Sequence, residues 1–252
     1  MRKISATKIF TGQYFTTVPS VLVLNDAGKI LAIEPANHFA AGEVEMFDGI
    51  LCPGFINAHC HLELSYMRGR IPEGNGLVQF IMDLLRIRNE KMEVVLEEIT
   101  KADEEMWQNG IQAVGDISND DHTFPQKQKS KLRYHTFVEA YGFNPENAAQ
   151  HFTDAQRVFK VARELNLDAS ITPHAPYSVP PDLFKLIFEF KENHPSVFSM
   201  HNQETKAETE FFESGTGDFQ KLIKKFFKIE EDVFTPSGKR SLETVLQFLP
   251  AD

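Results

Sequence analysis

The fold of this chain is decided by one stretch of sequence, Pro53-Gly54-Phe55-Ile56-Asn57-Ala58-His59-Cys60-His61. The Pro-Gly pair marks a turn, and the apolar residues after it predict a buried strand over residues 54–58. Alternate residues of an extended segment point to the same side, so His59 and His61 can bind one metal ion from the end of that strand. An isolated His-x-His pair is usually incidental, but the preceding strand and the histidines downstream favour a metal site. Cys60 is expected to face away, as a small buried residue and not as a ligand.

The chain before this stretch is rich in short strands. Residues 21–24 and 30–33 are apolar runs on either side of Asn25-Asp26-Ala27-Gly28, a sequence typical of a hairpin turn. Residues 4–47 show no helical period. We therefore predict a small β-rich domain over residues 1–50 and a second domain over residues 51–252.

Beyond Leu51, short apolar runs alternate with helical patterns, which is typical of βα units around a parallel sheet. Apolar residues at helical spacing begin at Met92, and Pro180-Pro181-Asp182 predicts the start of another helix. A final helix is predicted from Leu242, ending near Pro250. Strands are predicted over residues 54–58, 113–117, 134–140, 169–172 and 197–200. These βα units are too few to close a barrel of the TIM type.

The polar residues that can carry chemistry follow the predicted strands. In parallel βα architectures the loops after the carboxyl ends of the strands hold the active site, so these residues are expected to lie at one rim. They are His59, His61 and Glu63 after the first strand, Asp116 and Glu139 at the ends of the second and third, His174 after the fourth, and His201 with Glu204 after the fifth. The other histidines lack this setting and are expected to be ordinary structural or surface residues: His38, His122, His135, His151 and His194.

His201 and Glu204 form a His-x-x-Glu sequence after the predicted strand 197–200. A third imidazole suits a zinc or iron site that keeps a position open for water. The carboxylate of Glu204 could take a proton from that water and pass it to a leaving group. Glu204 could instead be an acid at a helix N-terminus, favoured by the helix dipole. His174 lies between two prolines, which suits a substrate contact, although a purely structural role is an alternative.

Asp116 and Glu139 each have two interpretations. Either carboxylate could accept a hydrogen bond from the ring N–H of a metal-binding histidine and so orient the ring. Helix capping or hydrogen bonding within the core explains both residues equally well. Competing catalytic motifs, such as phosphate-binding loops and the nucleophile elbow of serine hydrolases, do not occur in the sequence.

Composition and charge argue against several classes of protein. The 36 acidic residues outnumber the 26 lysines and arginines, and the formal charge of -10 disfavours nucleic acid, whose phosphates bind clustered cations. The 2 cysteines cannot build a disulfide framework, which favours a reducing compartment. The sequence has no signal-peptide core and no apolar run of membrane-spanning length. We expect a cytoplasmic protein that binds neither nucleic acid nor a membrane.

Three motifs together resemble the amidohydrolase superfamily, and most of all its branch of cytosine deaminase-like enzymes and aminohydrolases or chlorohydrolases. They are the stretch Pro53 to His61, Pro173-His174-Ala175-Pro176-Tyr177 and Met200-His201-Asn202-Gln203-Glu204. The motifs span most of the chain in the family's order. The resemblance implies an α/β fold, a distorted TIM-type barrel, here incomplete. It also implies a small β-sandwich built from the N-terminal strands and a returning C-terminal segment.

The resemblance also implies roles for single residues. Members of this branch bind one divalent metal ion, and zinc is favoured here over iron. The equivalent of Glu204 carries protons, and the equivalent of His174 contacts the substrate. Glu63 and Gln79 fall near the region where the branch contacts its substrate, which makes them candidate substrate-binding residues. The metal ligands implied by the resemblance are His59, His61 and His201.

The sequence departs from the family pattern at its C-terminal end. This branch also uses a histidine after the sixth strand and a metal-binding aspartate after the eighth, and both would lie beyond residue 252. Asp218, Asp232 and Asp252 lack a preceding apolar strand and are not expected to replace that aspartate. We therefore expect the chain to be a fragment or a truncated gene product and to be inactive by itself, an expectation that metal-dependent turnover would contradict.

The sequence thus predicts a metal-dependent hydrolase that acts on C–N bonds other than peptide bonds. The favoured reaction is deamination of an aminated heterocycle of the purine, pyrimidine or triazine type by metal-activated water. Hydrolysis of a cyclic amide, as in imidazolonepropionase-like relatives, is an alternative and would form a carboxylate without releasing ammonia. A second alternative is an inactive remnant that binds a ligand. The expected partner is a small-molecule substrate, and the chain could form a homodimer, as relatives commonly do.

Overall fold

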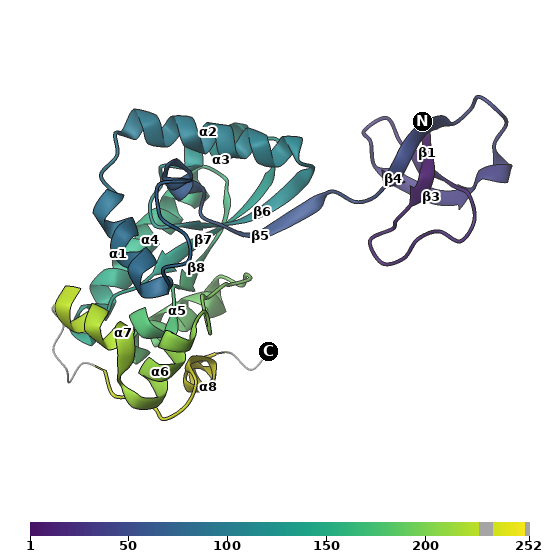
Figure 1. The fold of residues 1–252 in the computed structure, drawn as a ribbon. Coiled ribbons are helices and arrows are strands. Elements are labelled where there is room, and N and C mark those ends of the chain that lie inside the picture. The colour runs from purple at the N-terminus through teal and green to yellow at the C-terminus, as the bar shows by residue number, and fades with distance from the viewer. Residues whose placement is uncertain (227–233, 250–252) are drawn as a thin grey trace. The chain divides into compact units, whose positions relative to one another are not determined.

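The computed structural model describes residues 1–226 and 234–249 and divides the chain into two compact units, Met1–Phe55 and Ile56–Asp252. Figure 1 traces both units. No helix within the described residues combines the length and the apolar character needed to cross a membrane.

The first unit contains a four-stranded sheet built from β1 (Arg2–Ile9), β2 (Ser20–Leu24), β3 (Ile30–Pro35) and β4 (Glu45–Leu51). The strand order is β3-β2-β1-β4, in which β1 pairs antiparallel with β2 and parallel with β4. The predicted strands 21–24 and 30–33 are confirmed as β2 and β3, which pair antiparallel. In the turn between them, Asn25 Oδ1 accepts hydrogen bonds from the amides of Ala27 and Lys29, at 3.0 and 2.9 Å.

The second unit contains a sheet built from β5 (Phe55–Cys60), β6 (Ile111–Ser118), β7 (Arg133–Ala140) and β8 (Asp168–Pro173), in that order. β7 pairs parallel with both β6 and β8, so the carboxyl ends of these strands meet at one edge of the sheet. These elements confirm four of the predicted strands. Over the described residues this sheet stays open, and no closed barrel forms.

Helices alternate with these strands, as the sequence pattern predicts. They are α2 (Met92–Gln108) before β6, α3 (Phe124–Lys129) before β7, α4 (Ala148–Glu164) before β8, and α5 (Pro181–Asn193) after β8. Pro181 lies in the first turn of α5, where backbone N–H groups have no partner within the helix, so its missing N–H costs no hydrogen bond. Val138 and Ile171 of the sheet share one apolar core with Phe184 of α5. That core anchors the strands whose carboxyl ends carry the candidate site.

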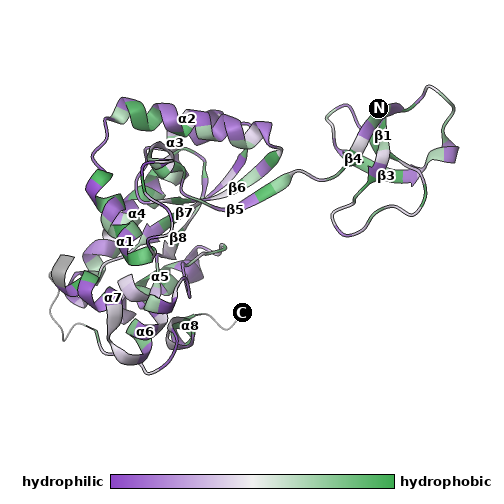
Figure 2. Cartoon of the chain, in the orientation of Figure 1, coloured by the Kyte–Doolittle hydropathy of each residue, from purple (hydrophilic) through white to green (hydrophobic). Residues whose placement is uncertain are grey.

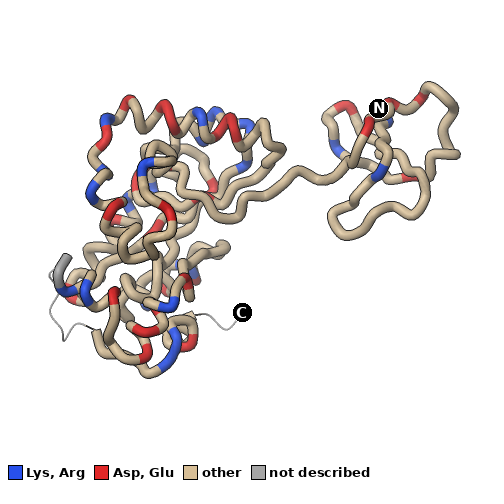
Figure 3. The backbone as a smooth tube through the Cα atoms, in the orientation of Figure 1, with Lys and Arg blue, Asp and Glu red and all other residues tan. Residues whose placement is uncertain are grey.

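Helix α2 is amphipathic, and its inner side packs on η2 (Leu62–Met67), the short 3-10 helix that follows β5. Val95 and Ile99 are buried in that contact. Figure 2 shows polar and apolar residues alternating along α2, and Figure 3 shows acidic residues along it. The buried Asp103 carboxylate is satisfied by hydrogen bonds, one of them from Tyr134 OH at 2.6 Å.

The predicted fifth strand, residues 197–200, is wrong: the structure assigns no strand between α5 and α6 (Lys206–Ser214). The side chain of Thr172 takes the place of strand pairing, because its Oγ1 donates to Ser199 O and accepts from Ser199 N. Backbone pairing resumes only where His201 N donates to His174 O at 2.9 Å. Val197 is 63% exposed, so this segment is not the buried strand that its apolar residues suggested.

The remaining described helices follow η2 and α5 along the chain. Helix α1 (Leu77–Ile87) has no fully buried residue, whereas Phe211 of α6 and Phe219 of α7 (Gly217–Lys221) belong to a third apolar core with Tyr177. The predicted last helix is confirmed as α8 (Ser241–Val245), continued by a 3-10 turn over Leu246–Phe248. Pro250, where that helix was predicted to end, and Asp232 and Asp252 lie outside the described residues.

Gly115 in β6 is required by the close approach of β5. A Cβ atom added there would lie 2.5 Å from Ala58 O and 2.9 Å from Phe137 Cε2, which is closer than packed atoms approach. We expect Gly115→Ala to lower the free energy of unfolding by about 1–3 kcal/mol, the usual cost of overpacking. Urea denaturation measures this cost, with Gln112→Ala, an exposed change in the same strand, as the control. An unchanged midpoint for Gly115→Ala would contradict the contact.

Candidate metal centre and active site

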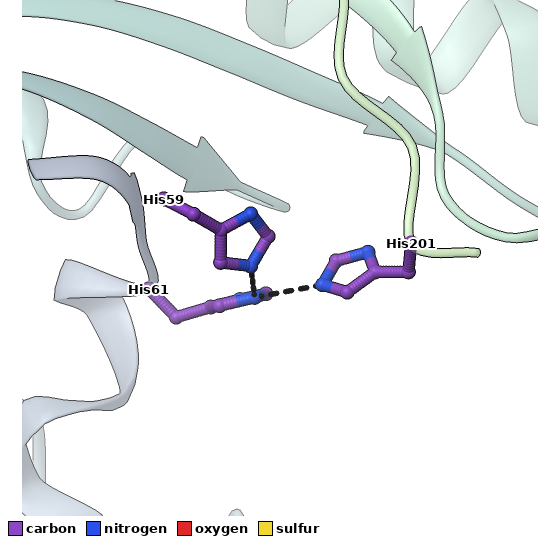
Figure 4. A group of neighbouring side chains, drawn as sticks. All are labelled: His59, His61 and His201. Carbon is purple, nitrogen blue, oxygen red and sulfur yellow. Dashed lines mark hydrogen bonds between the residues drawn. The ribbon is translucent and has the colours of Figure 1, made fainter. Parts of the chain in front are cut away.

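Three imidazole rings converge at the carboxyl edge of the second sheet. His61 Nε2 lies 3.2 Å from His59 Nε2 and 3.1 Å from His201 Nε2 (Figure 4). Zinc–nitrogen bonds at tetrahedral angles place two ligand nitrogens about 3.3 Å apart. The spacing of these three nitrogens therefore fits one small cation at the point that they face. β5 and its end supply His59 and His61, and the loop after α5 supplies His201.

The lowered pKa values of two of the three rings also suit a metal ligand, which must be a neutral imidazole. Burial lowers the pKa of His61 to about 4. Burial and the neighbouring His201 lower the pKa of His59 as well. Burial alone would lower the pKa of His201, but the Glu139 carboxylate beside it raises that pKa above its ordinary value. The site thus holds two neutral imidazoles and a third whose second nitrogen faces a carboxylate.

That second nitrogen fixes the direction of His201. His201 Nδ1 lies 3.1 Å from His174 O and 3.3 Å from Glu139 Oε1, so its N–H can donate to the carbonyl while Nε2 points toward His61. Such a partner on the far nitrogen is usual for a metal-binding histidine. Glu139 lies beside this ring as a charged neighbour, and its other oxygen, Oε2, accepts from Asn119 Nδ2 at 3.2 Å. For Asp116 the structure supports a core hydrogen bond, because Asp116 Oδ1 accepts from the backbone N–H of Leu62 at 2.8 Å.

Glu204 is held by two different groups. Glu208, which is fully buried, accepts from Glu204 N at 2.7 Å and from Gln203 N at 3.1 Å, and Gln203 has a φ of 55°. Tyr177 OH donates to Glu204 Oε2 at 3.2 Å. Thr205 is the N-cap of α6 and the acid in its first turn is Glu208, so the interpretation of Glu204 as that acid is wrong. Burial raises the pKa of Glu204, which brings the carboxylate closer to proton exchange at neutral pH.

His174 lies beside these groups on the loop after β8. Its Nδ1 is 2.6 Å from Ser178 Oγ, and its ring centroid is 5.1 Å from that of His201. Burial lowers the pKa of His174, which keeps the ring neutral. With Nδ1 engaged by Ser178, Nε2 is the nitrogen that His174 can offer to a bound molecule.

The converging side chains form the floor of a cavity of about 650 Å³. This volume is within the usual range of small-molecule sites. His61, His174, His201 and Glu204 contribute the polar floor, together with Glu139, and the walls are mostly apolar. Much of one wall comes from α1, through Leu77, Phe80, Ile81, Leu84 and Leu85. A ligand in this cavity would thus meet the polar groups of the candidate site, the apolar side chains of α1, and further charged side chains that include Arg68, Arg88 and Lys101.

Glu63 and Gln79 lie near this cavity, although neither is among the side chains that line it in the described part of the chain. Glu63 is buried, and its two oxygens accept from Asn119 N and Nδ2, both at 2.9 Å. Burial raises the pKa of Glu63 to about 7. Gln79 donates to Asp83 of its own helix at 2.8 Å. Their contact with a substrate stays a prediction, and Asn119, which lines the cavity, is a candidate that sequence reasoning missed.

Cys60 faces away from the three nitrogens, as expected. It packs in the apolar core of η2 and α2. Within the described residues, two groups of side chains could hold a metal, and Cys60 is in neither: they are His59, His61 and His201, and Glu139, His174 and His201. The five histidines expected to be ordinary also stay outside those groups. Tyr177 and Glu208 were not predicted, because a tyrosine after a Pro-rich loop and a glutamate in a helix carry no signal of a site until the chain is folded.

Comparison with known proteins assigns this chain to a family. Residues 50–231 match the model of the amidohydrolase family. The aminodeoxyfutalosine deaminase of Nitratiruptor sp. is 27% identical over 186 residues, which cover 71% of this chain and 45% of the relative. The chain therefore spans about half the length of the curated relatives it matches.

Solved structures show the same fold. A Helicobacter pylori aminofutalosine deaminase in complex with methylthio-coformycin has a TM-score of 0.78 at 24% identity, covering 91% of this chain and 58% of that one. A Xanthomonas campestris adenosine deaminase with bound zinc has a TM-score of 0.61 at 17% identity, covering 98% and 54%. These folds are TIM-barrel-like, and the parallel sheet of the second unit corresponds to part of such a barrel. The chain belongs to the amidohydrolase family.

Proposed function

We propose that this chain carries the metal-binding and proton-transfer residues of a hydrolase that deaminates an adenosine-like heterocycle. The observation that carries the proposal is the convergence of three Nε2 atoms, those of His59, His61 and His201. Two of these rings, His61 and His201, line the same cavity as Glu204. Three histidines with an open fourth position are one of the catalytic arrangements of zinc. Relatives named as deaminases of aminodeoxyfutalosine and adenosine support the reaction class.

Zinc is the proposed ion. Imidazole nitrogens suit both zinc and iron, but nitrogens spaced for tetrahedral geometry favour zinc. When bound, the ion supplies a Lewis acid that makes water nucleophilic near neutral pH. The residues of this chain supply the rest of the chemistry.

Glu204 is proposed to move the protons of the reaction. Tyr177 occupies Oε2, which leaves Oε1 to take a proton from the attacking water and to deliver it to the departing amine. A C–O bond forms as the C–N bond breaks, and ammonia leaves with the proton that Glu204 carried. His174 is proposed to hold the ring of the substrate through Nε2, because Ser178 engages Nδ1. The apolar wall from α1 excludes water around the rest of the substrate.

The test measures metal content and product together. Zinc titration of metal-free protein is expected to saturate at one ion per chain. The protein as its gene encodes it is then incubated with adenine nucleosides, guanine, cytosine and aminated triazines, and ammonia is measured. Ammonia release from an adenine nucleoside supports the proposal. A new carboxylate without ammonia would favour cyclic amide hydrolysis, and absence of zinc binding would refute the proposed site.

A further inference from the structure

A buried ion pair contacts the backbone directly after His61. Lys127 Nζ of α3 is 2.6 Å from Asp116 Oδ2 of β6, and both side chains are 0% exposed. Neither residue lines the cavity within the described part of the chain, and the proposed reaction uses neither. A lysine and an aspartate so completely removed from water need a physical reason, because burying charges is costly.

The free oxygen of Asp116 reaches the backbone next to a metal ligand. Asp116 Oδ1 accepts from Leu62 N at 2.8 Å, and Leu62 directly follows His61. Leu62 begins the 3-10 helix η2, whose first amides have no partner within the helix. The carboxylate therefore fixes the peptide that joins His61 to η2, and with it the point from which the imidazole of His61 extends.

Lys127 in turn fixes the carboxylate. Its ammonium group contacts three oxygens, which are Asp116 Oδ2 at 2.6 Å and the hydroxyl oxygens of Ser118 and Thr136, each at 3.0 Å. Three acceptors use all three N–H bonds of a lysine. Ser118 Oγ also donates to Asp116 Oδ2 at 3.2 Å. The pair thus connects α3, β6 and β7 to the backbone beside His61.

A buried ion pair is a weak source of stability, because well-packed apolar side chains often stabilise a core as much or more. What this pair adds is a fixed orientation of the Asp116 carboxylate, because the carboxylate can satisfy all its partners in one orientation only. We propose that Asp116 and Lys127 are positioning residues of the metal centre, which hold the peptide after His61 and thereby increase the affinity for the metal. The inference rests on the proposed metal site.

Two double variants of the full chain separate this role from the burial of charge. Asp116→Asn with Lys127→Met removes both charges but keeps an oxygen that can accept from Leu62 N. Asp116→Ala with Lys127→Met removes the charges and that acceptor. We expect the asparagine variant to bind zinc nearly as tightly as the wild type, and the alanine variant to bind it about 10–100-fold more weakly, as when other supporting partners of metal ligands are removed. Competition with a chromophoric chelator measures both dissociation constants.

The controls exclude a general loss of stability. Val158→Ala opens a cavity in the separate core under α4 and should lower the urea midpoint of the metal-free protein without weakening zinc binding. Lys129→Met, an exposed change in α3, should alter neither property. Equal zinc affinity in the two double variants would overturn the inference alone, whereas no zinc binding by the wild type would overturn the metal site itself. If the alanine variant does not fold, Ser118→Ala replaces it, and unchanged zinc affinity there overturns the inference.

Discussion

Replacing Glu204 by glutamine is expected to leave zinc binding intact and to lower kcat by about 10²–10⁴-fold, the usual contribution of a general acid–base group. Glutamine keeps the shape of the side chain and can still accept a hydrogen bond from Tyr177, which donates to Oε2 at 3.2 Å in the wild type. It cannot carry a proton between the water and the leaving amine. The loss should therefore fall on the chemical step and not on the affinity for substrate.

The measurement compares kcat, KM and zinc content for the two proteins in the form that the gene encodes. Glu210→Gln is the matched control, because Glu210 is a nearby acid of α6 that does not line the cavity. It should change none of the three quantities. Retained turnover in Glu204→Gln would refute the role of Glu204, and loss of zinc with turnover would show that the substitution damaged the metal centre instead.

Replacing His61 by alanine is expected to weaken zinc binding by more than about 100-fold, because removing even an outer partner of a ligand costs about 10–100-fold. His61 is the central ring of the three, with Nε2 at 3.2 Å from His59 and 3.1 Å from His201. Its loss leaves only two histidine nitrogens, whereas catalytic zinc sites usually have three protein ligands. Inductively coupled plasma mass spectrometry of the dialysed protein measures the metal that remains.

The variant also separates metal binding from folding. His38→Ala, an exposed change in the first unit, should keep full zinc content. Zinc should raise the urea midpoint of the wild type, because a ligand that binds the folded state stabilises it, and should leave that of His61→Ala unchanged. A His61→Ala protein that keeps one tightly bound zinc ion per chain would contradict the assignment of this ligand.

The placement of polar residues at the ends of strands was predictable, because the spacing of apolar residues in the sequence distinguishes strands from helices. The run before His59 and the apolar segment before His174 each predicted a strand, and parallel pairing then brings their ends together. The convergence of His61 with His201, 140 positions apart, followed from the family resemblance, because the strand predicted directly before His201 does not form. The site was thus predictable to the level of which loops meet.

What could not be predicted depends on contacts between side chains distant in sequence. The apolar segment 197–200 has the composition of a strand, but the Thr172 hydroxyl replaces its pairing. Lys127 has the sequence setting of an ordinary helix lysine, and only the fold reveals that it is buried against Asp116. Glu63 follows the strand that carries His59, yet Asn119 donates hydrogen bonds to both its oxygens. In each case a partner from another element decides the outcome.

The wall that α1 contributes to the cavity has a thermodynamic consequence. Because none of its residues is fully buried, α1 depends on partial contacts for its order, and local opening of such a helix requires less free energy than opening of the core. A molecule that fills the cavity covers Phe80 and Leu84 and adds the contacts that the helix lacks. Amide hydrogen exchange in α1 should therefore slow with increasing ligand concentration, so the exchange rate of this helix reports how much of the protein has a ligand in the cavity.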